Sequence, residues 1–302
     1  MSKSTRAMRI IAAILAMLFI FSAFPIMVSA EGEYISIKNE TDLKNIKNDM
    51  TAKYRLDADI EISSAWTEPI GGTAAFEGEL EGNGKTISKF NLVFNSTGTT
   101  AYAGLFSTVS GIVKNLKISG EITATNTSNS SATLYVGSIA GSCGIFGSIE
   151  SCQSSVEIVA KLAPTAASGS FFGAYTGKLY VGGICGYYGG WFTLGECANK
   201  AAITANCIPV AASGKTANAT VYVGGIAGYA GTIENCYNSK SITGKATTTS
   251  GSATSYVGGI VGQGNTIRTS YSNGGKITGT AANNNYVGGA AGELYSATSC
   301  YF

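Results

Sequence analysis

Apolar and polar residues follow one recurring pattern through the last two hundred residues of the chain. Each copy opens with a tyrosine, continues through glycine and small apolar residues, and ends in short apolar stretches separated by Gly, Asn and Ser. The copies begin at Tyr102, Tyr135, Tyr180, Tyr222, Tyr256 and Tyr286. Successive starts lie 33, 45, 42, 34 and 30 residues apart, a period typical of stacked repeats and not of a single closed core.

The copy that begins at Tyr256 shows which elements to expect in each repeat. Its pattern predicts strands over 256–261, 266–271 and 276–280 and turns over 262–265 and 272–275, where Gly and Asn accept positive φ. Helical periodicity is missing, and Val, Ile, Thr and Tyr dominate. Three strands per repeat predict an all-β fold: a right-handed parallel β-helix of three-strand coils, each covering the apolar face of its neighbour.

The segment before the repeats predicts a cap. Residues 40–47 carry early acids and place Leu43 and Ile46 three apart, which indicates a short amphipathic helix over the open end of the solenoid. Residues 54–62 alternate as a strand, and 76–87 indicate two strands around a Gly-Asn-Gly turn. The first coils are therefore expected here.

The first thirty residues predict a secretory signal peptide. Lys3, Arg6 and Arg9 precede an apolar run over 10–24, and Val-Ser-Ala at 28–30 suits signal peptidase. A membrane anchor is the competing interpretation, although the run is short for a span of about 20 residues. The expected organisation is a signal peptide at 1–30, a cap with first coils at 31–98, and repeats at 99–302. The last repeat stops in mid-coil, which predicts that this chain is the amino-terminal part of a longer protein.

Composition excludes several classes of function. Histidine is absent, which rules out Ser-His-Asp or Cys-His catalysis within the chain and any histidine-bound zinc. The four aspartates, Asp42, Asp49, Asp57 and Asp59, precede the repeats, so Asp-based calcium turns have no ligands there. Removing three basic residues with residues 1–30 leaves 17 against 18 acids, which gives no electrostatic footprint for nucleic acid. We expect no cofactor, metal or catalytic residue.

Cysteines recur at one position of the repeat. Cys152, Cys197, Cys236 and Cys300 follow their tyrosines by 17, 17, 14 and 14 residues, Ser270 holds this position in the Tyr256 copy, and Cys185 stands where other copies have Ala or Val. This regularity predicts buried free thiols that pack as small hydrophobes. One or two disulfides remain an alternative, and a thiol nucleophile would lack an activating histidine.

Two further series allow a structural or a functional interpretation. Glu150, Glu196 and Glu234 precede the cysteines by one or two residues and predict a solvated column, with a glycosidase-like carboxylate pair as the alternative. The repeated tyrosines predict a ladder that fixes the register between coils, with a sugar-binding platform as the alternative.

The copies differ most in length between the third strand and the next tyrosine. These stretches are rich in Ser, Thr, Ala, Asn and Gly and cover 123–134, 161–179, 205–221, 245–255 and 280–285. Insertions at one point of each repeat predict loops on one side of the rod, a usual place for binding. Residues 171–175 form an aromatic cluster among them.

The repeats resemble GLUG-motif proteins of bacterial surfaces. The resemblance rests on Ala103-Gly104-Leu105-Phe106 with 111–116, and on Val223-Gly224-Gly225-Ile226 with 233–238; the lead-in at 66–71 extends it to about residues 35–302. It implies a β-helical region of a large secreted or wall-attached protein, either adhesin-like or the non-catalytic part of an immunoglobulin A-cleaving zinc peptidase. This chain has no His-Glu-x-x-His motif and no sorting signal.

Two function classes follow from these observations. The preferred hypothesis is a non-enzymatic module, secreted or on the bacterial cell surface, that binds a glycan or a host extracellular protein or acts as a spacer. The alternative is an accessory region of a larger secreted enzyme, a peptidase or a polysaccharide-active protein. A stand-alone lyase ranks third, because the repeats offer no Asp and a single Arg, Arg268. We expect no nucleic-acid partner and no membrane insertion after signal cleavage.

Overall fold

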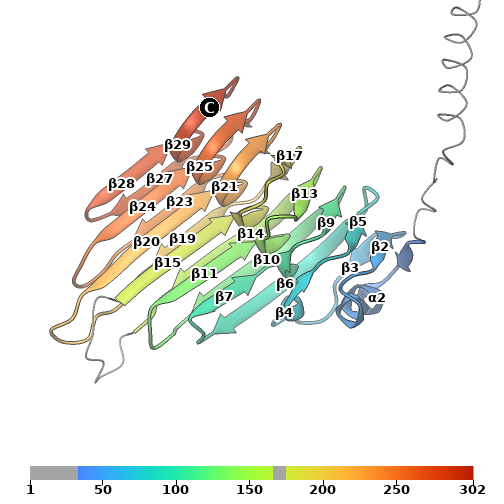
Figure 1. Ribbon diagram of the computed structural model, residues 1–302, viewed down its shortest axis with the longest axis horizontal. Coiled ribbons are helices and arrows are strands. Elements are labelled where there is room, and N and C mark those ends of the chain that lie inside the picture. The colour runs from blue at the N-terminus through green and yellow to red at the C-terminus, as the bar shows by residue number, and fades with distance from the viewer. Residues whose placement is uncertain (1–32, 166–174, 302) are drawn as a thin grey trace, which may run out of the picture. The chain divides into compact units, whose positions relative to one another are not determined.

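The computed structural model describes residues 33–165 and 175–301 of this chain (Figure 1). Nearly all of its elements are β-strands, and neighbouring strands pair in parallel throughout the stack. Residues 34–302 make up one compact unit, with one continuous apolar core on both sides of residue 98. The predicted all-β, parallel β-helical fold is confirmed.

The described strands form three sheets, which are the three faces of the coil. Sheet A contains β1 (Ile35–Ile37), β2 (Lys53–Leu56), β4 (Ile70–Phe76), β5 (Glu79–Glu81), β8 (Phe106–Val109), β9 (Ile112–Lys114), β12 (Ala140–Cys143), β13 (Ser148–Glu150), β16 (Cys185–Tyr188), β17 (Leu194–Gly195), β21 (Ala227–Glu234), β25 (Val261–Arg268) and β29 (Ala291–Thr298). Sheet B contains β3 (Ile60–Glu61), β6 (Thr86–Ser96), β10 (Lys117–Asn126), β14 (Gln153–Leu162), β18 (Ala198–Asn199), β19 (Ile203–Cys207), β22 (Tyr237–Asn238), β23 (Ile242–Ala246), β26 (Tyr271–Ser272) and β27 (Ile277–Ala281). Sheet C contains β7 (Thr100–Ala103), β11 (Ala132–Gly137), β15 (Tyr175–Gly182), β20 (Ala217–Gly224), β24 (Ala253–Gly258) and β28 (Asn284–Gly288).

Each coil runs from sheet C through sheet A to sheet B, and the predicted position of the first turn is wrong. In the Tyr256 copy the chain bends at Gly259 and Ile260, between β24 and β25, whereas 262–265 lies inside β25. Glycine at Gly262 serves close packing and not a turn: a Cβ there would lie 2.6 Å from the backbone nitrogen of Val223 in sheet C. The turn-like composition of 262–265 therefore reflects the tight approach of two sheets.

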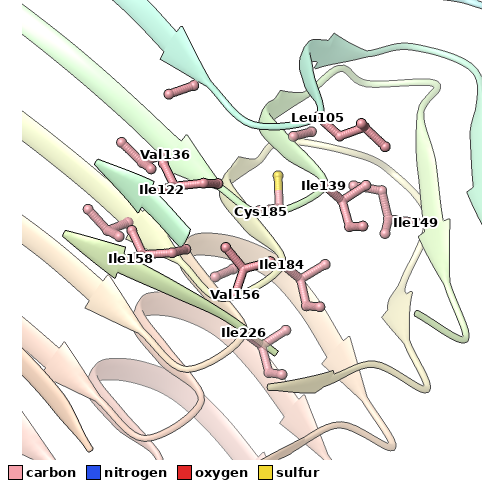
Figure 2. Close-up of a cluster of buried hydrophobic side chains, with 14 of the residues drawn as sticks. Leu105, Ile122, Val136, Ile139, Ile149, Val156, Ile158, Ile184, Cys185 and Ile226 are labelled. Atoms are coloured by element: carbon pink, nitrogen blue, oxygen red, sulfur yellow. The ribbon is translucent and has the colours of Figure 1, made fainter. Parts of the chain in front are cut away.

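The bend between sheets C and A fills the core with one branched side chain per coil. Leu105, Ile139, Ile184 and Ile226 stack there, and Figure 2 shows them beside residues from the other faces. The backbone continues the stack, because the N–H of Ile139 donates to the carbonyl of Ile184 at 3.0 Å, and that of Ile184 to Ile226 at 3.0 Å. All four side chains are fully buried. Hydrophobic burial and backbone pairing thus set the same register.

Sheet B carries a buried polar column beside this core. The amide Nδ2 of Asn199 donates to Oδ1 of Asn238 at 2.8 Å, and Nδ2 of Asn238 donates to Oγ of Ser272 at 3.3 Å. Both asparagine amides also donate to the backbone carbonyl two residues ahead, at 2.8 Å. Every step of this column is hydrogen-bonded, so burying these amides carries little desolvation penalty.

The cap helix predicted at 40–47 is present as α2 (Glu40–Asn45) followed by the 3-10 turn η1 (Ile46–Asn48). Asn39 is its N-cap, and the Asn39 side chain accepts a hydrogen bond from the backbone N–H of Asp42 at 2.9 Å. Leu43 and Ile46 are fully buried against the first coils. The helix therefore covers the amino-terminal end of the core, as terminal elements of a solenoid must.

The Glu40 carboxylate connects the cap helix to Ser63 and Ser64, which lie between β3 and β4, through hydrogen bonds. Because these bonds need an ionised carboxylate, the attachment depends on pH. Partial burial opposes ionisation, but hydrogen bonds from Ser64, Ser63 and Lys44 outweigh it and hold the pKa of Glu40 far below its ordinary value. Because the pKa of Glu40 is lowered in the folded state, its ionised carboxylate stabilises the folded protein fully at pH values above the unfolded pKa of about 4.3. This contribution shrinks as the pH falls below about 4.3 toward the folded-state pKa. We expect Glu40→Gln to lower the melting temperature at pH 7, and the difference from native protein to shrink in melts recorded at pH 4 and 3. An equal difference at every pH would contradict this.

Candidate binding surface

The repeated tyrosines form a continuous ladder on sheet C. Rings of Tyr102, Tyr135, Tyr180, Tyr222, Tyr256 and Tyr286 stack with centroid separations of 4.5–5.0 Å and interplanar angles of 2–14°. Burial raises the pKa of Tyr135 to about 12. Because neighbouring rings cover one another's faces, the inner tyrosines cannot stack on a sugar, and the ladder instead fixes the register, as predicted.

Two additional tyrosines on sheet A complete this aromatic corner. Tyr187 and Tyr229 stack at 4.8 Å, and the Tyr187 ring meets Tyr135 and Tyr180 nearly perpendicularly, at 5.9 and 5.6 Å. Sheets A and C approach so closely here that a Cβ at Gly186 would lie 2.6 Å from the backbone nitrogen of Val136. Tyr187 therefore packs against the rings of Tyr135 and Tyr180 from the side.

The cysteines are free and mostly buried, which confirms the predicted thiol column. Six of the seven are buried, and Cys300 is partly exposed. Along the column, the backbone N–H of Cys197 donates to the Cys236 sulfur at 3.3 Å, and the N–H of Cys236 to the Ser270 hydroxyl at 3.0 Å. Cys185 pairs with Ala140 and Ala227 at the small buried site expected from the sequence.

Burial should make these thiols unreactive. Desolvation raises the pKa of Cys143 and of Cys207 to about 12, which leaves almost no thiolate at neutral pH. We expect a thiol-specific reagent to modify only Cys300 in the native protein and all seven cysteines after denaturation. Mass spectrometry after labelling counts the modified sites, and rapid native modification of any of the six buried cysteines would contradict the packing.

The three glutamates before the cysteines are solvated as predicted, with Glu150 and Glu196 exposed, but the predicted single column is wrong for Glu196, which does not share the position of the other two. Glu150 and Glu234 both pair with Gly195 in sheet A. Glu196 follows one residue later, at a corner where every described coil from Asn115 onward bends through positive φ, 55° at Glu196 and 52° at Ser151. Its carboxylate accepts a hydrogen bond from the Ser151 hydroxyl at 2.7 Å. An offset of one residue across this corner separates the acids that the sequence placed together.

The insertions lie along one edge of the stack, between sheets B and C (Figure 1). They are narrower than predicted, since β10 and β14 continue to Asn126 and Leu162. Their backbones also stack: the N–H of Ala163 donates to Asn126 at 2.8 Å, and that of Val210 donates to Pro164 at 2.9 Å. The described parts of this edge form a stacked polar rim. Of the aromatic cluster at 171–175, only Tyr175 lies within the described residues, and its side chain is buried.

A different surface exposes large apolar side chains together. We call it the aromatic patch; it consists of Ile145, Phe146, Trp191 and Phe192, which are 50%, 62%, 75% and 53% exposed. Phe146 and Trp191 come from consecutive coils, and their rings meet edge to face at 5.4 Å and 76°. Other strongly exposed apolar residues are scattered or lie on the last described coil, such as Tyr286 and Tyr295. Exposed apolar clusters of this kind mark interaction sites.

The aromatic patch exists because two coils carry extra residues within sheet A. Cys143, Tyr188 and Ala230 are register partners, as are Glu150, Gly195 and Glu234. The chain takes seven residues to cross from Cys143 to Glu150 and from Tyr188 to Gly195, but four from Ala230 to Glu234. The three additional residues bulge outward and carry apolar side chains that the core does not use.

Elsewhere the described residues offer shallow polar hollows. One of about 570 Å³ lies beside the cap and is lined by Lys44, Trp66 and Glu68 among others; another of about 410 Å³ follows the corner between sheets A and B, beside Asn115 and Glu196. Within 33–165 and 175–301 no three Cys, Asp or Glu side chains are grouped to hold a metal ion. The same residues include no helix long and apolar enough to cross a membrane.

Comparison with known proteins supports the fold and the repeat. Residues 219–243, which run from within β20 in sheet C to the start of β23 in sheet B, match the GLUG motif, which confirms the resemblance found in the sequence. The structure is similar to the crystal structure of a putative immunoglobulin A1 protease from Bacteroides ovatus, with a TM-score of 0.50 and 21% identity over 90% of this chain and 76% of the other. No curated protein matches the chain.

Proposed function

We propose that this GLUG-motif β-helix is a non-enzymatic binding module that works outside the cell, secreted or at a bacterial surface, with the aromatic patch as its contact surface. The observation that carries the proposal is the grouping of four exposed large apolar side chains on two neighbouring loops, whereas the other exposed apolar residues are scattered or lie on the last described coil. Each such side chain forgoes much of the roughly 1.5–3 kcal/mol of stabilisation that full burial would contribute, so a bound partner is the simplest reason for their presence on the surface.

Binding suits the described residues better than catalysis. The thiols that could act as nucleophiles are mostly buried without a base, and the acids nearest to them are split between two positions. The GLUG-motif resemblance adds an extracellular setting, which the expected signal peptide at 1–30 would serve. Amino-terminal sequencing of secreted protein should begin at Glu31.

A binding screen tests this function. The purified protein is applied to arrays of glycans and extracellular proteins, next to Phe146→Ala/Trp191→Ala and to Tyr295→Ala as a control that removes an even more exposed ring elsewhere. We expect ligands that the double variant loses and the control keeps. Binding that survives in the double variant would move the contact surface away from the patch, and no binding at all would leave a spacer.

The alternative function is an accessory, non-catalytic region of a larger secreted enzyme. The fold similarity to the putative immunoglobulin A1 protease favours it over other enzyme contexts. The reading frame beyond the codon for residue 302 discriminates the two: a zinc-binding His-Glu-x-x-His motif supports the enzyme, whereas further repeats or a wall anchor support the binding module.

A further inference from the structure

We propose that the aromatic patch binds a neutral saccharide, with pyranose rings stacked on the open ring faces of Trp191 and Phe146. This inference rests on the proposed binding function and assigns it a ligand class. Pyranose rings carry a face of C–H groups, which is attracted to the electron-rich face of an indole or phenyl ring. The patch presents such faces to solvent, whereas the inner rings of the tyrosine ladder do not.

The difference lies in the ring geometry. Ladder rings are nearly parallel at 4.5–5.0 Å, so each inner ring has both faces covered. Phe146 and Trp191 meet at 76°, and an edge-to-face pair uses only one of its four ring faces internally. With exposures of 62% and 75%, these two side chains keep ring surface free for a ligand.

The two loops hold the rings in place before any ligand arrives. The N–H of Trp191 donates to the carbonyl of Ile145 at 3.0 Å, and the N–H of Gly189 donates to Cys143 at 3.1 Å, so the parallel pairing continues through both loops. Beneath them, the buried Tyr188 hydroxyl donates to the carbonyl of Gly147 at 3.3 Å. A preorganised surface loses little conformational entropy on binding, which suits a weakly apolar ligand such as a sugar.

Charge and size favour a neutral saccharide over other partners. The loops 144–148 and 189–193 contain no charged residue but offer the hydroxyls of Ser148 and Thr193. They lack the basic residues that attract anionic lipid surfaces. Four such side chains expose roughly 500 Å² in total, on the scale of 150–250 Å² per aromatic residue, which is less than the ~800 Å² per partner of a stable protein interface.

Tryptophan fluorescence tests the assignment, because the chain has two tryptophans and only one is exposed. Trp191 reports on the patch, whereas Trp66 is 5% exposed and should stay silent. The purified protein is titrated with β-1,4-linked oligomers of glucose, mannose, xylose and N-acetylglucosamine, with anionic polygalacturonate, and with phosphatidylcholine vesicles. We expect a saturable blue shift with at least one neutral oligomer, and a Kd raised about tenfold or more by Phe146→Ala.

Controls separate the possible failures. Calorimetry with Trp191→Phe should show retained binding without the spectral change, and far-ultraviolet circular dichroism should show that each variant keeps its fold. A shift with vesicles alone would replace the saccharide by a lipid surface. No shift with any oligomer, together with patch-dependent protein binding in the array screen, would overturn the saccharide and leave the binding function standing. Loss of patch-dependent binding in both experiments would overturn both.

Discussion

Phe106→Ala is expected to lower the free energy of unfolding by about 3–5 kcal/mol, because it removes a fully buried ring from the middle of a stacked core. Phe106 lies in β8, has no exposed surface and stacks on Phe76 at a centroid distance of 4.5 Å. Phe76 belongs to the preceding coil, so the substitution loosens the contact between two coils as well as leaving a cavity. Chemical denaturation followed by far-ultraviolet circular dichroism measures the change.

Phe192→Ala provides the matched control. It removes the same atoms from a side chain that is 53% exposed, so we expect a change in unfolding free energy within about 0.5 kcal/mol. Equal destabilisation by the two substitutions would mean that the division between core and surface is wrong.

Gly224→Ala should be at least as damaging, with a loss of about 3 kcal/mol or more, although it adds a single methyl group. A Cβ at this position would lie 2.1 Å from the carbonyl oxygen of Ala227 and 2.5 Å from the Cα of Val261. Both are backbone atoms and cannot rotate away. Its register partners Gly182 and Gly258 are glycines too, since the same bend recurs in each coil.

Gly231→Ala is the control for this second prediction. Gly231 lies in the same strand, β21, but a Cβ there would approach only the carbonyl of Gly190, at 3.8 Å, and its φ is not positive. We expect unchanged stability or a gain of up to about 1 kcal/mol, because alanine restricts the unfolded chain. Melting curves for the two variants decide the matter; similar losses would show that the bend is not where the structure places it.

Features that recur once per coil could be predicted from the sequence. The tyrosines and cysteines return at a constant position within the repeat, and constant position in a parallel solenoid means stacking. The cap helix followed from Leu43 and Ile46, whose spacing is that of one helix face. In each case the need to pack the same side chains, between coils or under one helix face, produces both the pattern in the sequence and the contacts in the structure.

Features that depend on how the sheets meet could not be predicted in this way. Gly262 looks like a turn residue in the sequence, yet it lies inside strand β25. Glycine is needed there because sheet C approaches so closely that no side chain fits. Glu196 misses the position of Glu150 because Gly195 holds that position, whereas Glu196 is equivalent to Ser151 and lies in the left-handed region at the corner. Glycine and small polar residues serve turns, corners and close packing alike, so composition alone does not separate these uses.

The aromatic patch was missed for another reason. Phe146 and Trp191 are far apart in the sequence and look like isolated loop residues, whereas the expectation of binding centred on the polar insertions between sheets B and C. A signal was present: the two longest spacings, 45 and 42 residues, start at Tyr135 and Tyr180, the coils with additional residues in sheet A. Aligning the copies against one another would have placed both insertions, and their aromatic residues, at one level.

The central claim is that in-register coils bring residues 45 positions apart into one exposed aromatic pair. Nuclear Overhauser contacts in solution test it most directly, using protein with selectively labelled tryptophan and phenylalanine, in which Trp66→Phe leaves Trp191 as the sole indole. The structure predicts strong contacts between the Trp191 indole and the Phe146 ring, whose centroids lie 5.4 Å apart, in the absence of any ligand. Contacts from Trp191 to a different coil, or none to Phe146, would contradict the register and with it the proposed binding surface.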